Sequence, residues 1–199
     1  MVHVEVIDPL LPTGDGHTLL RHEDQSGLKL TYITTRGELN EAEQANILRL
    51  ARARKPAVAT LLDDIYLRRL HKRMFGDVWT WAGQYRKVET NIGIDPTRIS
   101  VAVRNLVDDA KAWIAAGGET DEIVAGFHHQ LVAIHPFPNG NGRHARMAAD
   151  YLVVGLGHPV FTWGASSGYE LSKLRAEYIA ALQEADRGDL ARLTAFIRS

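Results

Sequence analysis

One short segment of the chain combines the residue types needed to move a phosphate-containing group onto a hydroxyl. Residues 135–146 read HPFPNGNGRHAR, which places a histidine, two glycines and two arginines close together. A neutral imidazole can accept a proton near physiological pH. Glycines at a helix start let backbone N–H groups bind an anion, and Arg143 and Arg146 add positive charge on one helix face. The segment therefore predicts a base, His135, beside an anion site.

Two predicted helices hold this segment between them. Residues 120–134 carry apolar side chains at helical spacing, and Pro136 cannot continue that helix. A second apolar run, residues 147–154, follows closely after Gly142. We therefore expect the segment to be a loop that leads from the end of one helix into the first turn of the next.

The order of residues in this loop resembles the signature HPFx(D/E)GNGRxxR of the Fic family, also called Fic/Doc or Fido. Residues 75–86, FGDVWTWAGQYR, similarly resemble the family's GDxYxWAGxxR segment. The likeness covers residues 61–199, and the N-terminal passage resembles the subfamily called mobile mystery protein B. The resemblance implies a mostly α fold, a Fic-type helical bundle with one small β-hairpin flap.

The resemblance also implies an activity and a set of site residues. Fic proteins of this kind are protein adenylyltransferases, or AMPylators, which transfer AMP from ATP to a Ser, Thr or Tyr hydroxyl of a target protein and release pyrophosphate. His135 is implied as the general base, and Phe137 as an anchor of the loop. The phosphates are implied to be bound by Gly140, Asn141, Gly142, Arg143 and Arg146.

Asn139 departs from the signature, because the family has an acidic, metal-holding residue at that position. Mg²⁺ prefers carboxylates and phosphate oxygens, so a neutral amide is a weak ligand. We expect the site to use ATP and Mg²⁺ with reduced activity, since His135 and both arginines are kept. Two alternatives stay open: a transferase with a different phosphate-containing donor, and a catalytically weak nucleotide-binding regulatory or toxin-like module.

Residues 86–99 predict a short exposed hairpin, because apolar residues alternate with polar ones until Asp95-Pro96. The resemblance implies that this flap pairs with a segment of the target protein as an added strand. The docking residues are then Thr90, Asn91, Ile92 and Gly93. Further helices are expected over residues 61–75, 101–116, 169–185 and 189–198, with Thr60 as an N-cap of the first and Trp79 and Trp81 as packing residues.

The chain is expected to divide into an N-terminal extension, residues 1–58, and a Fic domain, residues 59–199. A helix is predicted within residues 34–55, with Asn40 and Glu43 as its capping pair. Many Fic proteins carry an inhibitory helix with the pattern (S/T)xxxE(G/N), whose glutamate pairs with the second arginine of the signature. Glu38 has that spacing from Thr34, although a leucine follows it. Glu41 and Glu43 are competing candidates, and the inhibitory partner is either this helix or a separate antitoxin-like protein.

Composition excludes several other classes of function. The chain has 199 residues, a formal net charge of −1 and no cysteine, so neither a basic nucleic-acid surface nor cysteine chemistry is expected. No apolar run approaches membrane-spanning length, and no signal peptide is recognised, which together predict a cytoplasmic protein without a membrane partner. A metallohydrolase is disfavoured because no standard zinc spacing relates the four histidines His128, His129, His135 and His144.

Overall fold

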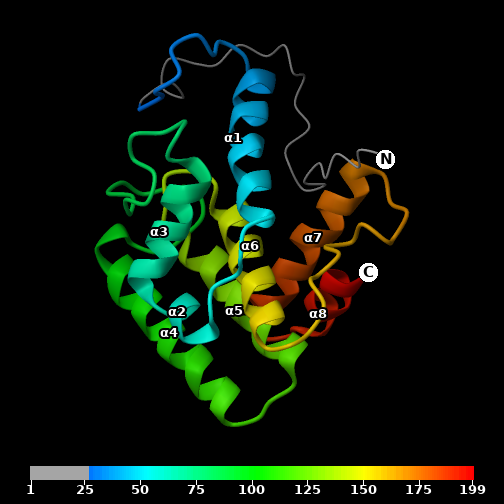
Figure 1. The fold of residues 1–199 in the computed structure, drawn as a ribbon. Coiled ribbons are helices and arrows are strands. Elements are labelled where there is room, and N and C mark those ends of the chain that lie inside the picture. Colours follow the sequence, from blue (N-terminus) through cyan, green and yellow to red (C-terminus); the bar gives the residue numbers. More distant parts are fainter. Residues whose placement is uncertain (1–26) are drawn as a thin grey trace.

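The computed structural model describes residues 27–199, and the earlier part of the predicted N-terminal extension lies outside this range. The described chain is mostly helical (Figure 1). Its elements are, in order, α1 (Arg36–Ala51), α2 (Val58–Leu61), α3 (Asp64–Phe75), the 3-10 turn η2 (Pro96–Arg98), α4 (Ile99–Ala115), α5 (Thr120–Ile134), α6 (Asn141–Gly155), α7 (Leu171–Ala185) and α8 (Ala191–Arg198). The mostly α prediction is confirmed.

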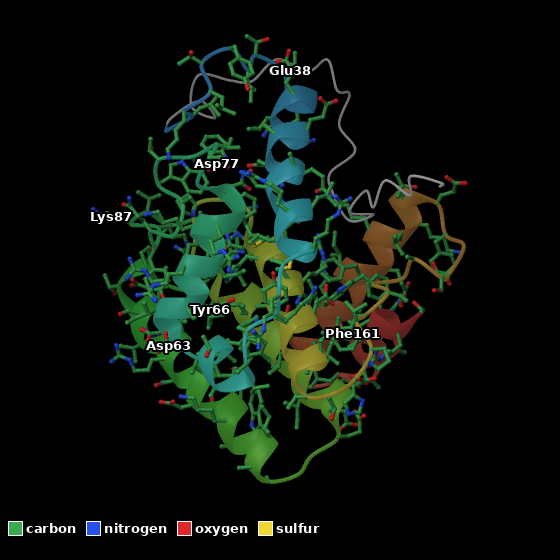
Figure 2. The ribbon with its side chains drawn as sticks, viewed as in Figure 1. Glu38, Asp63, Tyr66, Asp77, Lys87 and Phe161 are labelled. Carbon is green, nitrogen blue, oxygen red and sulfur yellow. The ribbon has the colours of Figure 1, made fainter. Side chains whose placement is uncertain are left out.

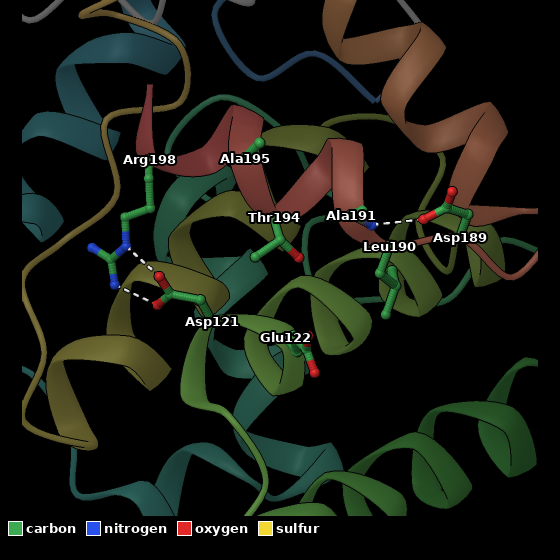
Figure 3. Close-up of a pocket in the computed structure, with 8 residues that line it drawn as sticks. All are labelled: Asp121, Glu122, Asp189, Leu190, Ala191, Thr194, Ala195 and Arg198. Carbon is green, nitrogen blue, oxygen red and sulfur yellow. Dashed lines mark hydrogen bonds and ion pairs between the residues drawn. The ribbon is translucent and has the colours of Figure 1, made fainter.

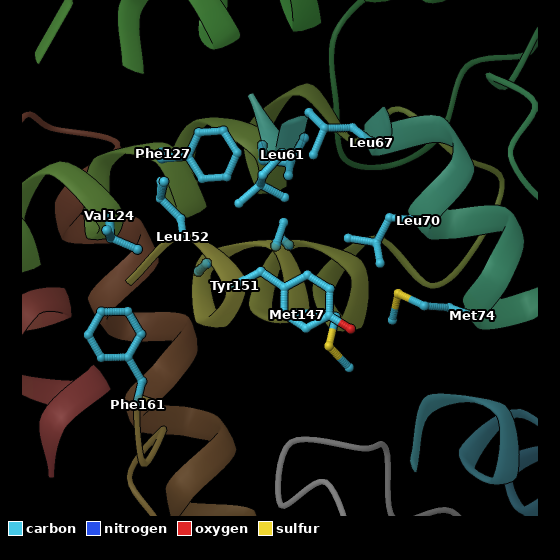
Figure 4. Packing of buried hydrophobic residues seen from close by; sticks show 14 of the residues in the cluster. Leu61, Leu67, Leu70, Met74, Val124, Phe127, Met147, Tyr151, Leu152 and Phe161 are labelled. Carbon is cyan, nitrogen blue, oxygen red and sulfur yellow. The ribbon is translucent and has the colours of Figure 1, made fainter. Parts of the chain in front are cut away.

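Helix α6 lies in the middle of the molecule, with α3 and α4 on one side and α7 and α8 on the other (Figure 1). It packs along α5, and the loop between these two helices is residues 135–140, so that the rest of the 135–146 segment forms the start of α6. In Figure 4, Tyr151 and Leu152 of α6 lie among Phe127 of α5 and Leu70 of α3, and all four side chains are buried. The loop is therefore built on the two best-buried helices of the described chain, which limits how far it can move.

Helix α1 begins earlier than the sequence predicts. The Thr35 side chain accepts a hydrogen bond from the Glu38 backbone N–H, and the Glu38 carboxylate accepts the Thr35 N–H in return, which together form a capping box. The predicted capping pair of Asn40 and Glu43 is therefore wrong, because both residues lie inside the helix.

The predicted helix over residues 61–75 is split into α2 and α3. Leu62, with φ −79° and ψ 62°, leaves the helical region, and Asp63 restarts the helix by accepting the Tyr66 N–H at 2.8 Å (Figure 2). Thr60 therefore lies within α2 and is not the N-cap of the longer helix. Helix α5 begins at Thr120 as expected, with Glu119 as its N-cap.

The predicted hairpin over residues 86–99 does not form. The described chain contains no sheet, and an isolated antiparallel bridge joins Leu28 and Trp79. The carbonyls of Val88 and Ile94, which a hairpin would pair across its strands, instead accept hydrogen bonds from the Arg86 guanidinium. The flap is thus a loop, because the Arg86 side chain binds backbone carbonyls that would otherwise accept hydrogen bonds between the two strands of a hairpin. No helix of the described part is long and apolar enough to span a membrane.

Candidate active site

His135 ends α5 and carries a half-buried imidazole. It has a left-handed backbone, with φ 51° and ψ 60°, and so closes the helix immediately before Pro136. The ring atom Nδ1 is buried, which leaves Nε2 as the nitrogen that can accept a proton from a substrate. Burial lowers the pKa of His135 below 6.5, with Arg86 acting in the same direction and the Val132 carbonyl opposing it. The imidazole is therefore neutral at physiological pH, as a general base must be.

Arg86 ties His135 to the flap, a role that the sequence did not predict. Its side chain is buried, with 3% of the residue exposed. Nε donates to the His135 carbonyl at 2.7 Å, Nη1 donates to the Val88 carbonyl at 3.0 Å, and Nη2 donates to the Ile94 carbonyl. The Arg86 backbone N–H also donates to the Pro136 carbonyl at 2.9 Å. One guanidinium thus fixes the base and both ends of the flap at once.

Asn141 braces the loop from within. Its Oδ1 accepts the Phe137 N–H at 2.8 Å, and its Nδ2 donates to the Phe137 carbonyl at 2.7 Å. The side chain is buried and both of its polar atoms are engaged with Phe137. Phosphate binding by Asn141 stays a prediction, and it depends on the backbone N–H. Phe137 is itself buried, as expected of an anchor.

His71 of α3 is a second brace of the same loop. Its Nδ1 accepts the Gly83 N–H at 3.0 Å, so the proton of the ring is on Nε2, which donates to the Asn139 carbonyl at 3.0 Å. The ring stacks on Phe137 with 3.7 Å between centroids. Burial is the main cause that lowers the pKa of His71 well below 6.5, so the neutral tautomer that this pairing requires is the stable one.

The first turn of α6 offers an anion site. Gly140 precedes it with φ 77°, and a Cβ there would lie 2.6 Å from the Phe75 ring, so only glycine fits. No side chain caps the helix, which leaves the backbone N–H groups of Asn141, Gly142 and Arg143 available to an anion. This is the arrangement that the glycine-rich segment predicts.

Arg143 is already engaged by a carboxylate from α1. Its Nη1 lies 2.8 Å from Oε2 of Glu43, and the Glu43 side chain is 2% exposed. The Arg143 guanidinium also lies over the Phe75 ring, 4.8 Å from its centroid. Glu43 therefore places negative charge beside the positions where phosphates would bind.

Glu38 does not reach this site. Its carboxylate accepts the backbone N–H groups of Thr34 and Thr35 at 2.8 and 3.0 Å, and Figure 2 shows it at the outer end of α1. These hydrogen bonds lower the Glu38 pKa, the one with Thr34 contributing most. Of the candidate glutamates, Glu43 is the one seen to meet an arginine of the signature, and that arginine is the first, Arg143, and not the second. Which glutamate inhibits stays a prediction.

Arg146 lies on the same face one turn further along α6. It is 7% exposed, and its guanidinium lies over the Tyr178 ring at 5.7 Å from the centroid. Its Nη1 is also 3.6 Å from the position that a Cβ on Gly142 would occupy. Arg146 is therefore next to the glycine of the anion site, and phosphate binding by Arg146 stays a prediction.

Asn139 fits a directly bound magnesium ion poorly. It is exposed, and its Oδ1 already accepts the Gly140 N–H at 2.7 Å. Mg²⁺ is normally held by carboxylates together with substrate phosphates. Within residues 27–199 no group of three or more His, Cys, Asp or Glu side chains could hold a metal ion. An ion at this site would depend on the oxygens of the nucleotide.

The flap residues lie beside the base. Gly93 has φ 113°, and a Cβ there would lie 2.7 Å from the His135 Cβ and 2.6 Å from Arg86 Nη2, so any side chain would disturb both. Thr90 Oγ1 donates to the Ile92 carbonyl at 2.5 Å, and Ile92 is exposed. Target docking by Thr90, Asn91, Ile92 and Gly93 stays a prediction, which the closeness of Gly93 to His135 favours.

One pocket of the described chain lies away from these residues. It measures about 670 Å³, sits between the start of α5 and α8, and is crossed by the ion pair of Asp121 and Arg198 (Figure 3). It lies at the opposite end of α5 from His135, about 21 Å away at the rise of an α-helix. None of the predicted site residues lines this pocket.

Comparisons with known proteins agree with this geometry. The model of the Fic/DOC family matches residues 61–153. A probable protein adenylyltransferase of Sinorhizobium fredii is 31% identical over 178 residues, which are 83% of this chain and 86% of the relative. Protein adenylyltransferase fic-1 of Caenorhabditis elegans is 28% identical over 141 residues, 68% of this chain but only 26% of the longer relative.

Solved Fic structures share the fold. Fic-1 from C. elegans superposes with a TM-score of 0.63 at 22% identity, covering 90% of this chain and 54% of that chain. BepC from Bartonella tribocorum, solved with bound AMPPNP, superposes with a TM-score of 0.62 at 19% identity, covering 89% of this chain and 97% of that chain. At these identities the likeness shows the fold alone.

Proposed function

Because the chain belongs to the Fic/DOC family, we propose that it is a protein adenylyltransferase that transfers AMP from ATP to a Ser, Thr or Tyr hydroxyl of a target protein. The observation that carries the proposal is a neutral base, His135, held one loop away from the uncapped, glycine-rich start of α6. The Sinorhizobium and Caenorhabditis relatives, both named as adenylyltransferases, support the same reaction.

The proposed reaction moves one proton and exchanges one P–O bond. Nε2 of His135 takes the proton of the target hydroxyl, and the hydroxyl oxygen bonds to the α-phosphorus of ATP. The bond from the α-phosphorus to the bridging oxygen breaks, and pyrophosphate leaves. The N–H groups at the start of α6 hold the phosphates, with Arg143 at their far end, where a planar fork binds phosphate oxygens well. Magnesium, if used, enters with the triphosphate.

We also propose that α1 represses this reaction through Glu43. A phosphate and the Glu43 carboxylate would compete for the same guanidinium of Arg143, so nucleotide binding requires Glu43 to withdraw. The repression is then internal to the chain, and a separate antitoxin-like partner is not needed to explain a silent site.

The test is incorporation of AMP from ATP labelled at the α-phosphate into the proteins of a bacterial lysate. Glu43→Gly should raise the rate at least about tenfold, since it removes a buried charge pair from the phosphate site. Glu41→Gly is the matched control inside the same helix, and Glu38→Gly tests the competing candidate at its capping box; neither should reach the rate of Glu43→Gly. Equal rates for all three variants would overturn the repression by Glu43, and absence of label with every variant would contradict the transferase.

Asn139 favours a second candidate, a nucleotide-binding regulatory module with weak catalysis. The loop retains its anion site and lacks only the acidic residue of the family signature. Tight ATP binding by Glu43→Gly without any incorporation of label would select this alternative. A transferase with another phosphate-containing donor would instead show label only when the donor is changed.

A further inference from the structure

The carboxylate of Glu43 has two partners, one for each oxygen. Oε2 faces Arg143 Nη1 at 2.8 Å, and Oε1 accepts the indole N–H of Trp79 at 2.6 Å. A carboxylate that is almost wholly buried needs a partner on both oxygens, because an unsatisfied one loses its hydration without return. Trp79 therefore contributes to the position of Glu43 as directly as Arg143 does, although the sequence indicated only a packing residue.

Trp79 is fixed by contacts that do not involve α1. Its ring is buried and stacks on Trp81, with 4.8 Å between centroids and 27° between planes. Its backbone N–H donates to the Phe75 carbonyl at 2.8 Å, directly after the end of α3. The indole N–H is thus a donor of fixed direction, carried by the core of the bundle.

We propose that Trp79 is a positioning residue for repression: its indole N–H holds Oε1 of Glu43 and so directs Oε2 onto Arg143. The inference rests on the proposed repression of nucleotide binding by Glu43. An indole N–H cannot ionise and only donates, so Trp79 anchors the glutamate without attracting phosphate itself. The carboxylate needs this anchor because it approaches from α1, a helix that packs mainly on α3.

Removing the anchor should loosen repression and leave the catalytic residues intact. In Trp79→Phe the ring still packs, but Oε1 of Glu43 loses its donor within a buried site. That loss destabilises the repressed arrangement by about one hydrogen bond to a charged group, which corresponds to about a tenfold gain in ATP affinity and in AMP transfer. In a Glu43→Gly background the carboxylate that Trp79 positions is absent. The same substitution should then change neither the ATP affinity nor the rate of AMP transfer.

The experiment compares four proteins: wild type, Trp79→Phe, Glu43→Gly and the double variant. The dissociation constant for ATP is measured by calorimetry, and AMP transfer is measured with α-labelled ATP. Trp113→Phe, the same change on α4 away from Glu43, is the control and should bind ATP like the wild type. The proposal is supported if Trp79→Phe tightens ATP binding only when Glu43 is present. Unchanged or weaker ATP binding by folded Trp79→Phe overturns it, as does an equal gain in the Glu43→Gly background.

A second measurement tests the same proposal without requiring that the Trp79→Phe variant folds. In a proton–nitrogen NMR spectrum of the wild type, the Trp79 indole N–H should lie downfield and exchange slowly with solvent. It should move to the ordinary indole range in Glu43→Gly and when the wild type is saturated with ATP. An indole signal that both changes leave in place contradicts the proposal. If Glu43→Gly does not bind ATP more tightly than the wild type, the proposed repression by Glu43 is wrong. If Glu43→Gly binds ATP more tightly and Trp79→Phe does not, only the proposed role of Trp79 is wrong.

Discussion

At the scale of single residues, the proposed chemistry depends on one histidine, His135, that is neutral and that a substrate can approach. Burial lowers the pKa of His144 to about 4 and that of His128 to about 3, and both bond to neighbouring groups away from the loop. His135 is only partly buried, and burial lowers its pKa below 6.5. Among these three, His135 is the histidine that a substrate can approach.

This difference predicts the pH dependence of AMP transfer. The base must be unprotonated, so kcat/KM should be constant at neutral and higher pH and fall as pH drops through the lowered pKa of His135, with its inflection below 6.5. The other two buried histidines titrate too far into acid to shift this limb. The measurement is kcat/KM against pH in the Glu43→Gly protein. An inflection above 6.5 would mean that His135 is not the base or is not desolvated.

Asn139 supports a prediction about magnesium. Asn139→Asp keeps the shape of the side chain and can still accept the Gly140 N–H, but adds a carboxylate beside the phosphate site. The magnesium concentration for half-maximal transfer should fall by about tenfold, the size of effect that one ligand change has on metal affinity. Asn139→Ala, which adds no charge, is the control. Loss of transfer, or an unchanged magnesium requirement, in Asn139→Asp would show that this position does not approach the metal.

Two glutamates show where reading single residues from sequence reaches its limit. Both Glu38 and Glu43 lie on α1; local spacing indicated Glu38 for inhibition, with Glu43 as a competing candidate and as half of a capping pair. In the structure Glu38 makes the capping box with Thr35, and Glu43 meets Arg143. Which glutamate meets Arg143 depends on how α1 packs on α3, and no local pattern carries that information. The partners of the Asn141 side chain were equally hidden, since they are backbone atoms of its own loop.

At the scale of elements, the sequence predicted most helices, but its prediction of a hairpin for the flap was wrong. Apolar periodicity located α5, α6, α7 and α8 closely, since each buries one face against a neighbour. Alternation over residues 86–99 indicated a hairpin, and it failed because Arg86 binds the carbonyls that a ladder would use. The partners of Arg86 are backbone oxygens, which every residue has. The sequence therefore contains no charged partner that would predict its role.

Arg86 therefore supports a prediction at the element scale. Arg86→Lys keeps the charge but cannot reach His135, Val88 and Ile94 together, since an ammonium has no planar fork. In the Glu43→Gly background kcat should fall on the order of 100-fold as the base and flap lose alignment, whereas the dissociation constant for ATP should hardly change. Steady-state kinetics and calorimetry separate the two. A parallel loss of ATP binding would place the role of Arg86 in the phosphate site instead.

At the scale of the whole molecule, the helices hold one loop, residues 135–140, in a fixed position. Helices α5 and α6 are buried together, and the loop between them is braced by His71 from α3, by Asn141 and by Arg86. Helix α1 reaches the start of α6 through the pair of Glu43 and Arg143. The proposed catalytic part thus lies on the central helices, and the proposed repressing part lies on α1.

The central claim is that this loop transfers AMP, with His135 as the base. The most direct test gives the Glu43→Gly protein and a bacterial lysate ATP labelled either at the α-phosphate or at the γ-phosphate, with Glu43→Gly/His135→Ala in parallel. Mass spectrometry then identifies the group added to the labelled protein. We predict α-label only, a mass increase equal to AMP on a hydroxyl residue, and loss of both in the double variant. Label from the γ-phosphate alone, or α-label that persists without His135, would contradict the account.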